Sequence, residues 1–359
     1  MRPLRLCKER RAGFSRCKYI SFSNQPKCVS FQAHEDNWQQ NQVVKTPTRF
    51  SRPVVVVSRC LCGAHCRWDG DTVHCPFVRT LKGYATIIPV CPEMEIGLGV
   101  PRERIVLVGS GRRVELFQPA TGQLLTRKMS RFARRFLTRL GEVDGFILKH
   151  KSPTCGLRKV KMYASTDRDA RFARTGVGLF AAQILAMHPH AAIEDEEHLA
   201  DHRIREHWLT RLFTLAAWRA AKTRGSATSL VRFHEYHHSL LAAYDKRLAR
   251  ELESIACRWQ TRRSCPTAEY GRCLLEILQK PPRRVSLAKP FERALSHYAP
   301  FIHEEERRNF VVQLKQYVAG STPLSDVRKT VQIWAVRYDK SFIRKERIYR
   351  PYPGPLAGM

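Results

Sequence analysis

Apolar residues follow two different patterns along the chain, and the pattern changes near residue 197. Before that point, short runs rich in β-branched residues cover residues 54–57, 86–90, 105–108, 114–117 and 145–149. Such runs are typical of buried strands, and the spacing between them predicts helices at residues 75–81, 122–140 and 178–187. Strands that alternate with helices predict an α/β domain with a mainly parallel sheet over residues 50–197.

After residue 197 the strand pattern disappears. Apolar residues at three- and four-residue spacing predict helices over residues 198–219, 226–255, 268–279, 290–298, 304–319 and 325–338. We therefore expect an all-helical domain over residues 198–348. Three prolines between residues 349 and 359 predict an extended tail.

The first 49 residues show no sustained apolar period. Residues 1–33 are rich in Arg and Ser and carry a single acid, Glu9, which is the composition of an organellar transit peptide. We expect a disordered or targeting extension at residues 1–49 and assign no chemistry to its three cysteines, Cys7, Cys17 and Cys28. Without such targeting, we expect a cytoplasmic protein.

The charge of the chain favours a polyanionic partner. Lys and Arg total 63 against 32 for Asp and Glu, a formal net charge of +31, and the excess is spread over the whole length. A charge of this size is typical of proteins that bind nucleic acid or other anions, although solubility alone also explains it. The longest apolar stretches are shorter than the roughly 20 residues that cross a bilayer, so we expect no membrane span. The oligomeric state is left open.

Twelve cysteines are present, and three of them share one context. Cys60, Cys91 and Cys155 each follow a predicted strand, and ligands of open α/β sheets bind at the carboxyl ends of the strands. Three thiolates that converge there would suit zinc or an iron–sulfur cluster. Three buried structural cysteines would give the same pattern.

The remaining cysteines and a histidine group have plainer interpretations. Cys60, Cys62, Cys66 and Cys75 form a possible zinc knuckle, which would leave Cys91 and Cys155 without a role. We expect the later cysteines, Cys257, Cys265 and Cys273, to be buried in helices. For His234, His237 and His238 we favour core packing or phosphate contact over metal binding.

The residues around the three strand-end cysteines carry a more specific signal. They read SRCLCG at residues 58–63, RWDG at 67–70, CPEMEIGLGVPR at 91–102, DGFILK at 144–149 and SPTCGL at 152–157. Over residues 52–195 the chain resembles the thiouracil desulfidase family. The resemblance implies a [4Fe–4S] cluster held by only three cysteines, Cys60, Cys91 and Cys155, with the fourth iron open to the sulfur of the substrate.

The second half of the chain resembles the helical domain of longer relatives. Residues 177–180, 193–196 and 203–206 are similar to the junction of these relatives, and residues 233–237 and 349–353 are similar to the YbgA-like helical domain. Residues 237–244, HHSLLAAY, depart from the pattern of that domain. Proteins with this fusion are similar to desulfidases that convert 4-thiouridine in tRNA to uridine, which implies tRNA or another thiolated RNA as partner.

Two other functions are compatible with these residues. One is a desulfidase for free thiouracil. The other is a non-catalytic nucleic-acid-binding protein whose metal site is structural or redox-sensing. A fourth metal ligand, for instance Cys62 or Cys66, would favour this second alternative.

Binding of the soft substrate sulfur to iron would polarise the C–S bond, so that a water could attack the ring carbon. A side chain must then take a proton from that water. Glu93 and Glu95 are the first candidates because they directly follow Cys91, and Asp69, Ser58 and Ser152 come next. The alternative for Glu93 is an ion pair with Arg67 or Arg102.

Basic residues near these motifs are candidates for RNA binding. Lys128, Arg131, Arg135 and Arg139 line one face of the helix predicted at residues 122–140 and would contact phosphates without reading sequence. Lys149, Lys151 and Lys161 flank the Cys155 motif and would hold a substrate phosphate or balance the charge of a cluster. Ordinary solvated surface explains both groups as well.

Overall fold

The computed structural model describes residues 50–109, 113–167, 170–261 and 267–357. The predicted extension at residues 1–49, with its three cysteines, and Cys265 lie outside the described residues. No helix among those that the structure describes is both long and apolar enough to cross a membrane.

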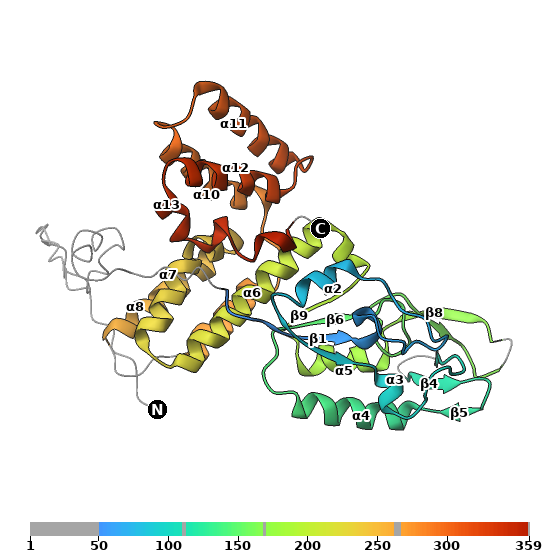
Figure 1. The fold of residues 1–359 in the computed structure, drawn as a ribbon. Helices are drawn as coiled ribbons and strands as arrows, with labels where there is room; N and C mark the ends of the chain where they lie inside the picture. The colour runs from blue at the N-terminus through green and yellow to red at the C-terminus, as the bar shows by residue number, and fades with distance from the viewer. Residues whose placement is uncertain (1–49, 110–112, 168–169, 262–266, 358–359) are drawn as a thin grey trace, which may run out of the picture. The chain divides into compact units, whose positions relative to one another are not determined.

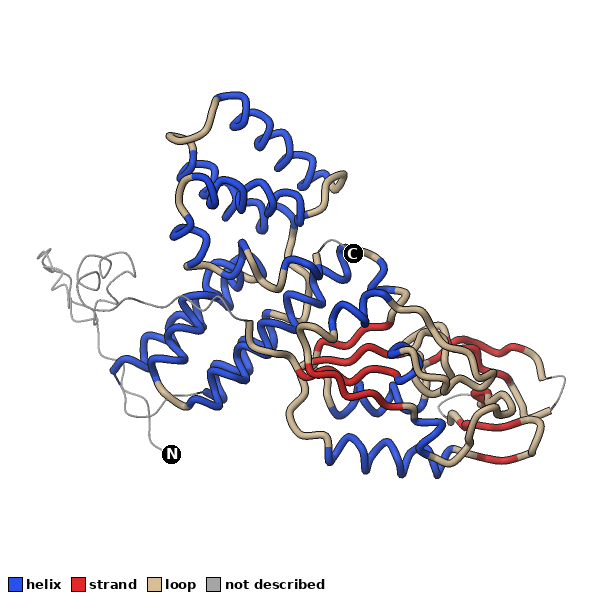
Figure 2. The backbone as a smooth tube through the Cα atoms, viewed as in Figure 1, coloured by secondary structure: helices blue, strands red, loops and turns tan. Residues whose placement is uncertain are grey.

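A parallel four-stranded sheet forms the centre of the first half of the chain (Figures 1 and 2). Its strands are β1 (Val54–Ser58), β2 (Thr86–Val90), β6 (Gly145–Leu148) and β9 (Ala192–Asp195), in the order β2-β1-β6-β9. All three pairings are parallel. The predicted α/β domain with a parallel sheet is confirmed.

The two faces of this sheet are covered by different helices. Val55 and Val57 of β1 face a core shared with α2 (Pro76–Leu81), whereas Val56 faces α4 (Thr126–Arg139) and α5 (Leu179–Met187). This alternation follows from the two-residue period of a strand. Because both faces are buried, β1 is apolar up to its last residue, Ser58, as the run of valines indicated.

A second sheet, which the sequence only partly indicated, lies beside the first. It has five short strands in the order β5-β4-β3-β7-β8, and only the β3–β7 pairing is parallel. The strands are β3 (Val106–Val108), β4 (Glu115–Gln118), β5 (Gln123–Leu124), β7 (Val160–Tyr163) and β8 (Phe172–Gly176). The helix predicted to begin at residue 122 therefore begins at Thr126, since the preceding residues pair with β4.

The second half of the chain is helical, as predicted, with two shifts of boundary. Its helices are α6 (His202–Arg224), α7 (Ala227–Tyr244), α8 (Lys246–Thr261), α9 (Thr267–Ile277), α10 (Arg284–Tyr298), α11 (Glu304–Ala319), α12 (Leu324–Arg337) and α13 (Lys340–Arg344). The single helix predicted over residues 226–255 is wrong, because Asp245 interrupts it. The Asp245 carboxylate accepts hydrogen bonds from the backbone N–H groups of Arg247 and Leu248, which starts a new helix. Helix α10 starts before Pro290 rather than at it, and the proline is buried inside the helix.

The helical half shares a core with the parallel sheet. Trp208, Leu209 and Leu212 of α6 pack against the β1 face that α2 covers, and the Trp208 indole N–H donates to the Ala192 carbonyl over 2.8 Å. Buried Asp144 accepts from the Val54 backbone N–H over 2.8 Å. Its carboxylate also pairs with Arg219 of α6 at 2.8 Å. Helix α6 is thus part of the support for the sheet.

The C-terminal tail is more structured than the prediction of an extended segment. A short 3-10 helix, η4 (Gly354–Leu356), lies within the region predicted to be extended, and another, η3 (Arg347–Tyr349), ends where that region begins. Tyr352 and Leu356 are buried in the core that contains α2 and β1. Apolar side chains between the prolines give this tail a buried position, which proline content alone does not indicate.

Candidate metal centre

Three cysteines lie at the carboxyl edge of three neighbouring strands. Cys60 is in η1 (Arg59–Cys62) directly after β1, Cys91 directly follows β2, and Cys155 ends a short loop after β6. All three are free thiols and at most 9% exposed. Because β2, β1 and β6 are adjacent in the sheet, the parallel topology brings to one edge residues that are far apart in sequence.

Cys66 is a fourth buried thiol at this edge. Its side chain makes hydrogen bonds with Cys60 and Cys91, and the bond with Cys60 raises the pKa of the Cys66 thiol to about 11. The Cys91 thiol also contacts the Cys66 carbonyl, at 3.6 Å. The turn over residues 63–70 produces this approach, since Gly63 and Gly70 both have positive φ.

The zinc knuckle considered from the sequence is not formed as one group. Cys66 lies with Cys60 and Cys91, whereas Cys62 interacts with Cys75 and with Lys82. Burial raises the pKa of both Cys62 and Cys75. The four thiols of that pattern are therefore divided between two places.

The spacing of the strand-end thiols does not match a single metal ion. Sulfur atoms of thiolates on one zinc ion lie about 4 Å apart. Over residues 50–109, 113–167, 170–261 and 267–357, only His150, Asp195 and His198 bring three potential ligand atoms within 4.8 Å of one another. A donor set of soft, buried, more widely spaced thiols fits an iron–sulfur cluster better than zinc.

The Cys155 thiol is the most desolvated of the group. Burial raises its pKa to about 12, and hydrogen bonds with Ser58 and Thr154 oppose this shift. The Thr154 hydroxyl lies 3.6 Å from the Cys155 sulfur. A thiol in such surroundings ionises readily only when a cation or metal balances the charge.

Glu93 is a carboxylate that acts on two of the thiols. It lies in α3 (Pro92–Glu95), and its charge acts on both Cys91 and Cys155. One carboxylate oxygen accepts from the Thr154 hydroxyl at 2.8 Å, and the other pairs with Arg102. Glu93 therefore joins the Cys91 helix to the Cys155 loop, and the ion pair with Arg102 considered from the sequence is also present.

The two predicted serines lie in the same place. The Ser58 hydroxyl accepts from the Lys149 backbone N–H at 2.9 Å and bonds the Cys155 thiol. The Ser152 hydroxyl accepts from the Cys155 backbone N–H at 3.1 Å and lies 3.4 Å from a Glu93 oxygen. Both hydroxyls thus fix the Cys155 loop.

Two other predicted candidates lie away from this group. Glu95 is exposed, although it is only two residues from Glu93. Asp69 is exposed as well and pairs with Arg67 at 2.8 Å. Residues two apart on a helix face in different directions, which explains why only one of the two glutamates reaches the thiols.

Thr154 was not singled out from the sequence, and Arg102 was considered only as an ion-pair partner of Glu93, yet both support the site. Arg102 is 9% exposed and donates to the Cys66 carbonyl at 3.1 Å and the Gly99 carbonyl at 2.9 Å, besides pairing with Glu93. The carbonyl of Thr154 accepts from the first residues of α5, and Gly178 lies so close to it that a side chain there would clash. These contacts hold the Cys66 turn and the Cys155 loop in place.

The predicted RNA-binding residues have different surroundings. Lys128, Arg131, Arg135 and Arg139 are exposed along α4, which contacts α3 near one end (Figure 1). Lys161 is exposed on β7, whereas Lys149 is half-buried and pairs with Glu196. The α4 stripe and Lys161 are therefore available to a partner, and Lys149 is engaged within the protein.

Two of the three candidate histidines of α7 are core residues, whereas His238 is exposed. His234 and His237 are 2% and 5% exposed, and burial lowers the pKa of each to about 3. Cys273 is likewise buried, in α9. His234, His237 and Cys273 confirm the expectation of core packing, whereas Cys257 is only half-buried.

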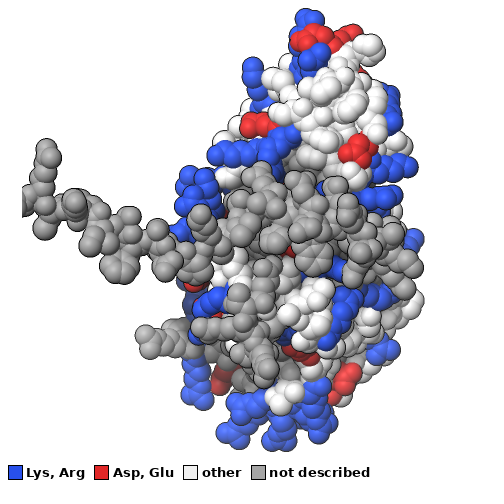
Figure 3. All heavy atoms as spheres, turned by 90° about the vertical axis from the view of Figure 1, so that its left-hand side faces the viewer, with Lys and Arg blue, Asp and Glu red and all other residues white. Residues whose placement is uncertain are grey.

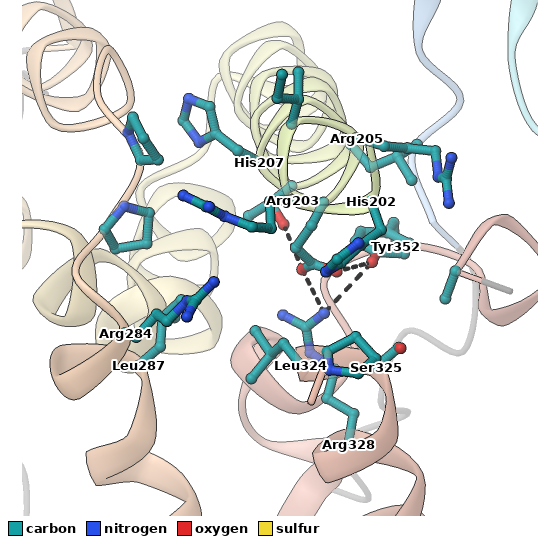
Figure 4. A pocket seen from close by; sticks show the side chains of 18 of the residues that line it. His202, Arg203, Arg205, His207, Arg284, Leu287, Leu324, Ser325, Arg328 and Tyr352 are labelled. Atoms are coloured by element: carbon teal, nitrogen blue, oxygen red, sulfur yellow. Dashed lines mark hydrogen bonds and ion pairs between the residues drawn. The ribbon is translucent and has the colours of Figure 1, made fainter. Parts of the chain in front are cut away.

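A basic pocket of about 490 Å³ lies among the helices (Figure 4). Arg203 of α6 and Arg284 of α10 point into it, while Glu206 is held by Arg328 and the Tyr352 hydroxyl. Leu240, Leu287 and Leu324 contribute apolar walls. The pocket combines apolar surface with guanidinium groups, which suits an anion that carries an apolar part.

Two family models match separate parts of this chain. Residues 55–196 match the family model of 2-thiouracil desulfurase, and residues 239–353 match a family described as a protein of unknown function, DUF1722. The uncharacterized protein YbbK of Bacillus subtilis (strain 168) is 29% identical over 110 residues, which are 29% of this chain and 73% of that protein. A solved structure, the [4Fe-4S]-dependent thiouracil desulfidase TudS, is 20% identical, covers 42% of this chain and 95% of its own, and has a TM-score of 0.32. The match to the 2-thiouracil desulfurase model thus contains all four thiols of the site, and the match to the DUF1722 model follows it in the helical half.

Proposed function

We propose that this protein is an iron–sulfur-dependent desulfidase that removes sulfur from thiolated uracil. The substrate that we propose is 4-thiouridine in tRNA. The observation that carries the proposal is the set of free, buried thiols of Cys60, Cys91 and Cys155 at one edge of a sheet in the matched domain. These three cysteines would hold a [4Fe–4S] cluster and leave one iron without a protein ligand. Such an iron, when bound, supplies a Lewis acid that accepts the soft sulfur of the substrate.

The overall reaction is a hydrolysis that needs no electrons. The thiocarbonyl carbon gains an oxygen from water, the C–S bond breaks, and the sulfur leaves as sulfide. The chain must therefore hold one water and accept its proton. Glu93 is the best-placed base because its carboxylate lies against both the Cys91 and the Cys155 segments, with Thr154 and Ser152 as proton-carrying neighbours.

Arg102 has a positioning role in this proposal. Its guanidinium pairs with Glu93 and simultaneously donates to the Cys66 carbonyl. Arg102 therefore holds the carboxylate of the proposed base at the cysteine edge.

The excess of positive charge on this protein supports RNA as the substrate. Figure 3 shows Lys and Arg side chains distributed over the described part of one face, with fewer Asp and Glu. The α4 stripe lies on the helix that contacts α3, and α3 carries Glu93. Basic residues on this helix would hold the phosphates that flank a thiolated base.

Removing charge from α4 should separate the two substrate classes. In a triple variant, R131Q/R135Q/R139Q, we expect KM for tRNA to rise about tenfold at low salt because phosphate contacts are lost. Turnover of free 2-thiouracil should be unchanged, since a free base has no phosphate. Steady-state rates with both substrates over a range of salt concentrations measure this.

The matched control removes three positive charges elsewhere, in the variant R308Q/K315Q/K340Q of α11 and α13. If both triple variants weaken tRNA turnover equally, overall charge rather than the α4 stripe recruits the RNA. Deleting the helical half is a poorer test, because Trp208, Leu209 and Leu212 belong to the core of the sheet.

Cys66 favours a second candidate function and makes it testable. Its contacts with Cys60 and Cys91 would allow it to act as a fourth thiolate, and a fully ligated cluster would be structural or redox-sensing.

Under the desulfidase proposal we expect Cys66→Ser to keep its iron and its activity, because three other thiolates remain. Iron content and the electron paramagnetic resonance spectrum of the reduced cluster check this. Loss of the cluster in Cys66→Ser, with no desulfidation by the parent protein, would favour the non-catalytic function.

A further inference from the structure

A compact group of histidine and carboxylate side chains lies beside the Cys155 loop but is separate from the thiols. His150 starts that loop after β6, and Asp195 and His198 lie at the end of β9 and in η2 (His198–Ala200). The Asp195 carboxylate is fully buried, and the His150 side chain is 3% exposed. One oxygen of Asp195 lies 3.3 Å from His150 Nδ1 and 3.0 Å from His198 Nδ1.

The two nitrogens of His150 face acceptors on both sides. His150 Nε2 lies 2.9 Å from a Glu197 oxygen, to which it donates when Nε2 carries the proton. Nδ1 is then a buried lone pair that lies 3.3 Å from an Asp195 carboxylate oxygen. Two acceptors at this distance repel each other unless a proton or a metal cation lies between them.

The geometry matches a tetrahedral metal site. Ligand atoms at about 2.0–2.1 Å from a zinc ion lie about 3.3 Å from one another, and the distances from Asp195 to the two imidazole nitrogens are 3.3 and 3.0 Å. The contact of Glu197 with the distal nitrogen of His150 is the carboxylate–histidine arrangement that orients metal-binding imidazoles.

We propose that His150, Asp195 and His198 bind a divalent transition-metal ion of the zinc type. Two imidazoles and one carboxylate suit zinc or cobalt, whereas magnesium and calcium prefer oxygen ligands alone. The ion would join the loop that carries Cys155 to the segment that leads into α6. It is a site distinct from the thiol group, and it does not rest on the proposed desulfidase function.

Arg158 is the competitor for this position. Its guanidinium contacts His198 Nδ1 and lies 3.8 Å from the same Asp195 oxygen. Arg158 also pairs with Glu194 at 2.8 Å, and its side chain is 38% exposed, so it has another partner and room to move. The surrounding charges are those of Glu194, Glu196 and Glu197 against Lys149, Lys151 and Arg158.

The test measures zinc bound by the full-length protein after its cysteine site has been filled with iron. The protein is incubated with zinc, desalted and analysed for zinc per chain. We expect one zinc ion, with nitrogen and oxygen but no sulfur ligands by X-ray absorption. His198→Gln should lose it, whereas His190→Gln, which changes an exposed histidine after α5, should keep it.

Arg158→Gln gives a result that a purely structural cluster would not produce. Removing the competing cation should raise the zinc affinity several-fold, measured by competition with a chelator, and zinc should raise the melting temperature of the parent and of Arg158→Gln but not of His198→Gln. The proposal is overturned if the parent and His198→Gln retain equal zinc, or if the bound zinc has sulfur ligands.

Discussion

Replacing Cys155 by alanine is expected to remove both the cluster and desulfidation. Cys155 is the thiol that the buried loop after β6 contributes, and two thiolates rarely hold a cubane. Iron per chain should fall from about four atoms to below one after anaerobic reconstitution. Turnover should fall to background, because no metal would remain to accept the sulfur of the substrate.

Iron and sulfide analysis of the purified variant, together with its circular dichroism, measures this effect. Cys273→Ala is the matched control, since Cys273 is also a buried free thiol but lies in α9 of the helical half. The control should keep iron and activity. Full iron and full turnover in Cys155→Ala would contradict the assignment of the site.

Replacing Glu93 by glutamine is expected to abolish most activity while the cluster stays. Glutamine preserves the shape of the side chain but cannot accept a proton from water, so the rate should fall about 10²- to 10⁴-fold. The three cysteines are unaffected, and iron content should therefore remain at the level of the parent protein.

Glu95→Gln is the matched control for this change. It makes the same substitution in the same helix, at an exposed position, and we expect it to retain near-parental activity. Equal rates for the two variants would show that Glu93 serves only as the partner of Arg102. A melting curve distinguishes a chemical effect from the cost of leaving Arg102 buried without its carboxylate.

The sequence indicated the parallel sheet and the strand-end cysteines because both depend on short-range patterns. A run such as residues 54–57 is apolar on both faces because helices cover both sides of the sheet, which marks it as a central parallel strand. A cysteine that directly follows such a strand lies at the carboxyl edge of the sheet. The contact of Cys66 with Cys60 and Cys91 depends instead on the conformation of the turn between Gly63 and Gly70. The spacing of apolar residues does not predict the direction that a turn takes.

Other features could not be read from spacing for similar reasons. Glu93 and Glu95 are equivalent in sequence, and only the packing of α3 selects Glu93. Strand β8 is mostly exposed, so it lacks the apolar alternation that marks a strand. The burial of Tyr352 and Leu356 depends on where the chain returns after residue 338, which is a property of the whole fold.

The most direct test of the account is the stoichiometry of the reaction on RNA. Iron-loaded protein is incubated anaerobically with tRNA that contains 4-thiouridine in water enriched in ¹⁸O, and nucleosides and sulfide are quantified. The account predicts one uridine and one sulfide for each 4-thiouridine lost, with the heavy oxygen in the uridine. If the cluster is present and neither this tRNA nor free thiouracil loses sulfur, the account is contradicted.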